Sequence, residues 1–213
     1  MCEIIFKGFA KIGRLNRQCT VSEKIDGTNG SIFIGENGEF LTGSRTRWII
    51  PGDDNYGFAK WANEHKEELL KLGKGTHYGE WWGGGIQRNY GLAKDDKRFS
   101  LFNTMRWCLF GETPKQIITG DPRIIKYQEV LPQCCGLVPI LYEGLFDTFI
   151  INGLLKIMTE QGSMAVKGFM KPEGVVIYHK SANVYFKATI EKDDEYKGKN
   201  DIRRNKTNDK SKM

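Results

Sequence analysis

Hydrophobic residues recur along the chain with two spacings, one typical of helices and the other of strands. Between residues 58 and 72 they lie three or four positions apart, which places them on one face of an α-helix. This face consists of Phe58, Trp61, Ala62, His65, Leu69 and Leu72. Polar residues 53–55 offer N-caps before it, and Gly73 is a stop signal after it. A second helix is expected from about Asn152 to Gln161, with Gly162 at its end.

Short segments rich in β-branched and aromatic residues predict strands. Segments 31–34 and 39–42 flank an Asn37-Gly38 step, and this arrangement predicts a β-hairpin. Further strands are expected at residues 20–22, 76–82, 99–110, 137–142, 174–179 and 184–189. Because many strands alternate with few helices, the pattern favours an α+β fold over a doubly wound parallel sheet.

The composition is that of a globular protein: of 213 residues, 39% are hydrophobic and 27% are charged. No apolar run approaches the roughly 20 residues that span a bilayer, and the first residues lack the pattern of a signal peptide. Five cysteines without a CxxC pair indicate reduced thiols rather than a zinc site. We therefore expect a monomer in the cytoplasm, or in the host cytoplasm for a viral protein, without membrane contact.

The net charge of +6 is concentrated at one end of the chain. Residues 196–213 contain seven Lys and Arg and two Asp, a net +5, which leaves +1 for the remaining 195 residues. Apolar residues almost vanish from residue 192 onward, so we expect a folded body, residues 1–191, and a flexible basic tail, residues 192–213. The tail is a candidate contact for nucleic-acid phosphates, and a purely solubilising role fits it equally well.

The most distinctive local sequence is EKIDGTNG at residues 23–30. By itself it predicts a polar turn between two strands, because Asp-Gly is a common turn step. Five further motifs follow in the chain: Ser44-Arg45-Thr46, Tyr78-Gly79-Glu80, FSLFN at 99–103, PEGVVI at 172–177 and Tyr185-Phe186-Lys187. In this order the six motifs resemble those of the covalent nucleotidyltransferases, the superfamily of ATP-dependent DNA and RNA ligases and capping enzymes.

The resemblance spans roughly residues 4–190, and the EKIDGTN wording, together with GGGIQ at 83–87, most resembles the phage-type RNA ligases. It implies that residues 1–191 form a nucleotidyltransferase (adenylation) domain with two mainly antiparallel sheets and flanking helices. No OB-fold or other C-terminal domain is expected after it. The implied function is ATP-dependent RNA ligation, which joins a 5′-phosphate to a 3′-hydroxyl through a lysyl-AMP intermediate. The implied partner is RNA, including nicked or hybrid duplexes.

The resemblance assigns the covalent chemistry to Lys24, whose amine attacks the α-phosphate of ATP and becomes linked to AMP. The amine must be neutral to attack, and nearby cations, here Lys187 and a bound Mg²⁺ or Mn²⁺, favour the neutral form. Lys187 is also implied to contact the α-phosphate, and Glu173 to hold the divalent cation. Thr189 stands where many relatives have a second lysine.

The resemblance also implies roles around the nucleotide and the nucleic acid. Glu80 binds the ribose hydroxyls, Phe102 stacks on adenine in preference to Phe99, and Glu23 belongs to the nucleotide site. Asn29 orders the water shell of the metal or the 3′-hydroxyl during sealing. Arg45 contacts the nucleic-acid phosphate or the reacting 3′ end, and its neighbour Arg47 competes for that role.

Other readings of the sequence stay open. A minimal ATP-dependent DNA ligase would carry the same motifs, and a non-catalytic RNA-binding module could keep a ligase-like fold together with the basic tail. The intact Lys24, Glu80, Glu173 and Lys187 argue against the binding module, since a pure binder needs no nucleophile. Trp81 and Trp82 are interpreted as buried strand residues.

Overall fold

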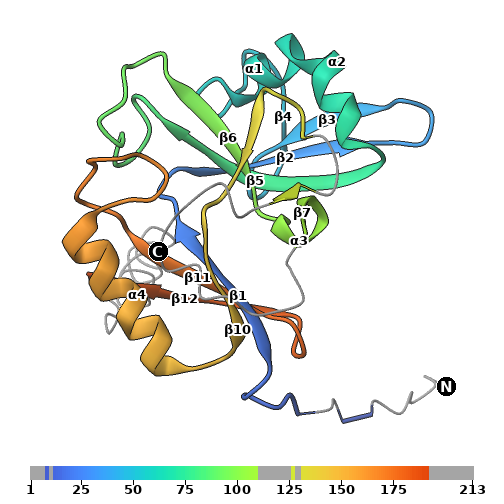
Figure 1. Ribbon diagram of the computed structural model, residues 1–213. Coiled ribbons are helices and arrows are strands. Elements are labelled where there is room, and N and C mark those ends of the chain that lie inside the picture. Colours follow the sequence, from blue (N-terminus) through green and yellow to red (C-terminus); the bar gives the residue numbers. More distant parts are fainter. Residues whose placement is uncertain (1–7, 10–11, 110–125, 128–130, 192–213) are drawn as a thin grey trace, which may run out of the picture.

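Two sheets form the body of the protein in the computed structural model, which describes residues 8–9, 12–109, 126–127 and 131–191 (Figure 1). Within these residues one sheet has four strands, in the order β10-β1-β11-β12, and another has six, in the order β4-β3-β2-β5-β6-β9. We call them sheet A and sheet B. All neighbours pair antiparallel except β6 and β9, so the predicted α+β fold with two mainly antiparallel sheets is confirmed.

The strands of sheet A are β1 (Gln18–Lys24), β10 (Ile140–Leu145), β11 (Gly174–His179) and β12 (Val184–Thr189). Those of sheet B are β2 (Thr28–Ile34), β3 (Phe40–Gly43), β4 (Trp48–Ile49), β5 (Gly75–Gly83), β6 (Lys97–Leu101) and β9 (Cys135–Leu137). A separate short pair joins β7 (Cys108–Leu109) to β8 (Lys126–Tyr127). The basic tail lies outside the described residues.

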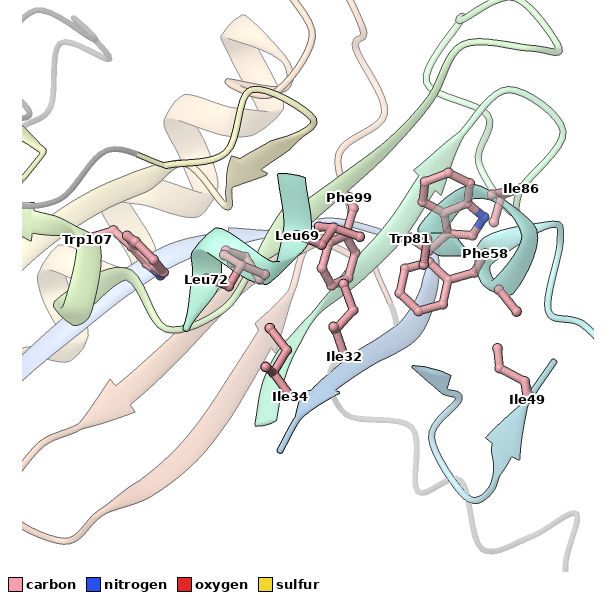
Figure 2. Close-up of a cluster of buried hydrophobic side chains, with 13 residues drawn as sticks. Ile32, Ile34, Ile49, Phe58, Leu69, Leu72, Trp81, Ile86, Phe99 and Trp107 are labelled. Carbon is pink, nitrogen blue, oxygen red and sulfur yellow. The ribbon is translucent and has the colours of Figure 1, made fainter. Parts of the chain in front are cut away.

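Helices cover one face of each sheet (Figure 1). Helix α1 (Phe58–Glu64), helix α2 (Lys66–Leu69) and the 3-10 turn η1 (Leu70–Leu72) lie on sheet B, α4 (Thr148–Gln161) lies on sheet A, and α3 (Thr104–Trp107) follows β6. Figure 2 shows the core under α1 and α2, where Phe58, Trp81 and Phe99 pack together with Ile32 and Leu69. Each sheet therefore buries one face against helices.

Gly73 acts as the predicted stop signal and ends the first helical region with a φ of +76°. The predicted N-cap is wrong, because α1 has Gly57 at this position and not one of residues 53–55. The Asp54 carboxylate nevertheless accepts hydrogen bonds from the amides of Ala59 and Lys60 in the first turn. The hairpin turn contains Gly38 at a φ of +84°. The predicted strands 174–179 and 184–189 coincide with β11 and β12.

Three predicted boundaries are wrong. The segment 99–110 is not one strand, because β6 ends at Leu101 and the chain then turns into α3. Segment 137–142 is split at Pro139, which has no N–H to donate to a ladder and where the chain passes from β9 of sheet B to β10 of sheet A. Helix α4 begins at Thr148 rather than near residue 152, since the Asp147 side chain accepts a bond from the amide of Phe149 at 2.8 Å.

Candidate active site

The uncovered faces of the two sheets line a cleft of about 1420 Å³. In a strand, alternate side chains point to opposite faces. In β1, Cys19 and Val21 pack in the core with α4, and Thr20, Ser22 and Lys24 line the cleft. In β5, Trp81 packs under α1, and Tyr78 and Glu80 line the cleft. The same alternation that buries the core therefore places the polar residues of two motifs in one cleft.

Lys24 lies at the end of β1 and contacts Glu173 just before β11. The Nζ of Lys24 is 2.5 Å from Oε2 of Glu173, and the side chains of Lys24 and Glu173 are 24% and 16% exposed. Lys24 is the cross-strand partner of Gly174 in β11, the residue next to Glu173. This register explains why Lys24 and Glu173, 149 positions apart in the sequence, are in contact. In this arrangement the proposed nucleophile and the proposed metal-binding carboxylate form an ion pair.

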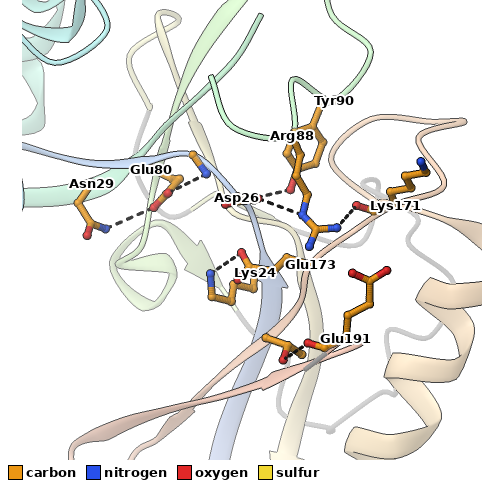
Figure 3. Close-up of polar contacts among 11 residues, drawn as sticks. Lys24, Asp26, Asn29, Glu80, Arg88, Tyr90, Lys171, Glu173 and Glu191 are labelled. Atoms are coloured by element: carbon orange, nitrogen blue, oxygen red, sulfur yellow. Dashed lines mark hydrogen bonds and ion pairs between the residues drawn. The ribbon is translucent and has the colours of Figure 1, made fainter. Parts of the chain in front are cut away.

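Glu80 is buried on β5 opposite Asn29 of β2 (Figure 3). Its Oε1 accepts a bond from the amide of Gly27 at 3.0 Å, and its Oε2 accepts one from Asn29 Nδ2 at 3.3 Å. Burial raises the pKa of Glu80 to about 7, although the Gly27 amide and the charge of Lys24 act in the opposite direction. A glycine is required at 27, because a Cβ there would lie 2.5 Å from the Trp81 carbonyl oxygen.

Phe99 and Phe102 have different environments. Phe99 is fully buried beside Phe58, with ring centroids 5.0 Å apart. Phe102 lines the cleft, partly buried against the cluster of Ile25 and Val138. Of the two, Phe102 lines the cleft and Phe99 packs in the core, and the stacking role of Phe102 stays a prediction.

The two candidate arginines are also distinguished by their positions. Arg45 is exposed and lines the cleft. Arg47 instead donates two hydrogen bonds to the Asp53 carboxylate, at 2.5 and 2.7 Å, and does not line the cleft. Lys187 of β12 is exposed, pairs with Val176 of β11 and lines the cleft.

Glu23 lines the cleft, but its carboxylate lies on the opposite side of β1 from Lys24. It is buried and accepts bonds from Ser163 Oγ at 2.6 Å and from the amides of Met164 and Ala165 at 2.8 and 3.0 Å. Burial raises the pKa of Glu23 above its ordinary value, although these hydrogen bonds act in the opposite direction. The side chain thus anchors the loop after α4, and any contact of Glu23 with a nucleotide is left to its main chain.

Sequence reasoning missed Arg88, which joins the EKIDGTNG motif to the residue just before the PEGVVI motif (Figure 3). Its Nε donates to Asp26 Oδ2 at 3.0 Å, and its Nη1 donates to the carbonyl of Lys171, also at 3.0 Å. The Asp26 amide in turn donates to Tyr90 Oη at 2.9 Å. Arg88 follows Gly83-Gly84-Gly85 in a loop where Gln87, Asn89 and Tyr90 all have positive φ angles. That glycine-rich run signals a loop, but nothing in it indicates a partner 62 residues away.

The described residues contain no group of three or more His, Cys, Asp or Glu side chains that could hold a metal ion. Mg²⁺ is commonly bound by one or two carboxylates together with substrate phosphates. A single carboxylate such as Glu173, which here pairs with Lys24, therefore fits a cation that arrives with a nucleotide better than a cation held by protein ligands alone. In the same part of the chain, no helix is long and apolar enough to cross a membrane.

Comparison with known proteins adds a sequence match and a fold match. The family model described as RNA ligase matches residues 17–189. A search of curated proteins finds no match. Two similar solved structures are variants of a Naegleria gruberi RNA ligase, an apo lysine-to-alanine variant with 21% identity and a glutamate-to-alanine variant with ATP and Mn with 18% identity, each with a TM-score of 0.50.

These alignments cover 82% and 83% of this chain but 50% and 51% of the Naegleria chains. The chain therefore spans about half the length of the solved structures it matches. At this level of identity the likeness concerns the fold, and it agrees with the arrangement of two sheets described above.

Proposed function

The chain belongs to the RNA ligase family, and on this premise we propose that it is an ATP-dependent ligase that joins a 5′-phosphate to a 3′-hydroxyl of RNA. The observation that carries the proposal is the gathering of Lys24, Glu80, Phe102 and Lys187 in one cleft from four separate motifs. Covalent catalysis of this kind splits a difficult phosphoryl transfer into easier steps.

In the first step Lys24 Nζ attacks the α-phosphorus of ATP. A bond forms between nitrogen and phosphorus, the bond to the β-phosphate oxygen breaks, and pyrophosphate leaves. The ion pair with Glu173 stabilises the charged amine, so we expect this contact to separate before attack. A divalent cation held by Glu173 would neutralise charge on the phosphates, and Lys187 would stabilise the negative charge that develops on the α-phosphate.

Glu80 and Phe102 would position the nucleoside. An ionised carboxylate accepts hydrogen bonds from ribose hydroxyls, and an aromatic face can stack on adenine. Because the pKa of Glu80 is raised to about 7, we expect ATP affinity to increase as the pH rises through that value.

In the later steps AMP passes from Lys24 to the 5′-phosphate of the RNA, and a 3′-hydroxyl then displaces AMP to seal the strand. We assign Arg45 to the RNA phosphates or the 3′ end, and Asn29 to the 3′-hydroxyl or to the water around the cation. The position of Asn29 beside Glu80 supports this role, because it lies next to the proposed ribose site.

The experiment that tests this function separates adenylation from sealing. Wild-type protein with ATP and Mg²⁺ or Mn²⁺ is expected to join 5′-phosphorylated RNA ends, and Lys24→Ala is expected to fail. On a 5′ end that already carries AMP, without ATP, Lys24→Ala is expected to retain sealing, and Arg45→Ala is expected to lose it. Failure of the wild-type protein on both substrates would refute the proposal.

A minimal DNA ligase is the alternative that shares these residues. Nicks that differ only in a ribose or a deoxyribose at the 3′ end distinguish the two. An RNA ligase is expected to favour the ribose end, and equal or better sealing of the all-DNA nick would favour the alternative.

A further inference from the structure

The cleft extends along sheet A well beyond the residues assigned to ATP. The cross-strand partners of β1 and β11 show the direction in which the cleft extends: Lys24 is paired with Gly174, and Thr20 is paired with Tyr178. Four residues of strand separate these two levels, a distance of about 13 Å at roughly 3.3 Å per residue. The part of the cleft around Tyr178 is therefore available to a ligand larger than a nucleotide.

Two tyrosines are stacked in this part of the cleft. Tyr178 of β11 and Tyr185 of β12 are direct cross-strand partners, with ring centroids 4.7 Å apart and an interplanar angle of 30°. Tyr178 Oη donates to Asn183 Oδ1 at 2.9 Å, which fixes the orientation of its ring. Tyr185 lies on the edge strand of the sheet and is 62% exposed. The pair thus presents an ordered aromatic face at the edge of the cleft.

Charges in the cleft are unevenly distributed. Glu23, Asp26 and Glu80 line it, but the carboxylate of Glu23 lies on the other side of β1. The remaining carboxylates, Asp26 and Glu80, belong to the nucleophile motif or contact it. Its other cations, besides Lys24, are Arg45, Lys74, Arg106, Lys180 and Lys187. Lys74 forms an ion pair with Glu36, and Lys180 forms one with Glu143, so part of their charge is balanced. The lining away from the nucleophile motif is nevertheless mainly cationic and aromatic, and this combination binds single-stranded nucleic acid through phosphate contacts and base stacking.

We propose that Tyr178 and Tyr185 form a platform on which an unpaired base of the RNA substrate stacks. The inference rests on the proposed function, since it takes RNA as the polyanion that enters the cleft. The platform recognises the π-face that every base has, so it favours unpaired over paired strands without selecting a sequence. A cross-strand aromatic pair also stabilises a hairpin, and the experiment must separate these two roles.

Two variants of the exposed ring make this separation. Tyr185→Leu keeps an apolar contact with Tyr178 but removes the aromatic face, and Tyr185→Phe keeps both. Phe149→Ala is the matched control, because Phe149 is 84% exposed on α4, outside the cleft lining. The probe is a short single-stranded RNA with one 2-aminopurine, whose fluorescence is quenched by stacking, and a blunt RNA duplex of equal length serves for comparison.

We expect Tyr185→Leu to weaken single-strand binding about 5- to 150-fold and to relieve the quenching, because stacking of a base on an aromatic ring contributes about 1–3 kcal/mol. Tyr185→Phe and Phe149→Ala should bind the strand like the wild type, and the duplex should bind all variants alike. Unchanged strand binding by Tyr185→Leu, or an equal loss for strand and duplex, would overturn the platform.

Labelling of Lys24 by ATP in the absence of RNA is measured on the same proteins. We expect every variant to be adenylated at the wild-type rate, which would show that the fold and the nucleotide site are intact. If the wild-type protein is not adenylated, the proposed function fails, whereas the comparison of strand binding among the variants still decides the role of the tyrosines.

Discussion

The contact between Arg88 and Asp26 makes a specific prediction about how the nucleophile motif is held. Both side chains are 29% exposed, so the pair is neither a surface ion pair nor a fully buried one. Exposed pairs contribute about 0–1 kcal/mol, and removing one partner of a buried pair costs about 3–5 kcal/mol. We therefore expect a coupling of about 1–2 kcal/mol between Arg88 and Asp26 in the free energy of unfolding.

A double-mutant cycle measures this coupling directly. Urea unfolding followed by circular dichroism would compare the wild type, Arg88→Ala, Asp26→Ala and the double variant. Arg88→Ala alone should cost about 2–3 kcal/mol, because it also removes the hydrogen bond to the Lys171 carbonyl. Asp96 and Arg98 provide the matched control. Their pair has two hydrogen bonds of similar length but is 40–44% exposed, and its coupling should stay below about 0.5 kcal/mol.

The same pair should affect catalysis, since Asp26 is two residues from Lys24 and Lys171 is two residues from Glu173. We expect Arg88→Ala to slow adenylation of Lys24 at saturating ATP more than it weakens ATP binding. Arg88→Lys should restore only part of the adenylation rate. It keeps the positive charge beside Asp26, but one ammonium cannot reproduce both directed hydrogen bonds of the guanidinium. Equal coupling energies for the two pairs, or an Arg88→Ala variant with wild-type adenylation, would refute this reasoning.

Substitutions at four further residues test other parts of the site and the core beside it. The pKa of Glu80 in the folded state, about 7, lies above the ordinary value of 4.5, so ionisation of Glu80 reduces the free energy of unfolding as the pH rises from 4.5 through 7. Glu80→Gln should remove this pH dependence in urea unfolding and should be more stable than the wild type by about 1–3 kcal/mol at pH 8. A stability difference between the two proteins that does not change with pH would contradict this prediction. Phe99→Ala should cost about 3–5 kcal/mol of stability, whereas Phe102→Ala should mainly weaken ATP binding in calorimetry; a larger loss of stability for Phe102→Ala would reverse the assignment. Glu23→Ala should destabilise the protein by about 2–4 kcal/mol, because it leaves the Met164 and Ala165 amides without their acceptor. Glu23→Gln should cost less. Equal unfolding midpoints for both variants and the wild type would show that the loop after α4 does not need this anchor.

Features encoded by neighbouring residues could be predicted from the sequence. The Asn37-Gly38 turn, the helical spacing before Gly73 and the alternation in β11 and β12 depend on local geometry, and each has the predicted type of structure. The order of the motifs also named residues that are in contact, such as Lys24 and Glu173.

Other features depend on contacts that a local pattern does not contain. The bond between Arg88 and Asp26 spans 62 residues, and the passage from sheet B to sheet A at Pro139 depends on the packing of both sheets. The direction of the Glu23 carboxylate is different, because it follows from strand alternation: Lys24 faces the cleft, so its neighbour in β1 faces the other side.

The central claim is that Lys24 forms a covalent bond to AMP. It is tested most directly by peptide mass mapping after incubation with ATP and Mg²⁺ or Mn²⁺, without nucleic acid. Lys24→Ala, confirmed to bind ATP, serves as the control. We predict AMP on the peptide that contains Lys24 in the wild type and no adduct in the variant. AMP on another residue, or an unmodified wild-type protein that binds ATP, would contradict the claim.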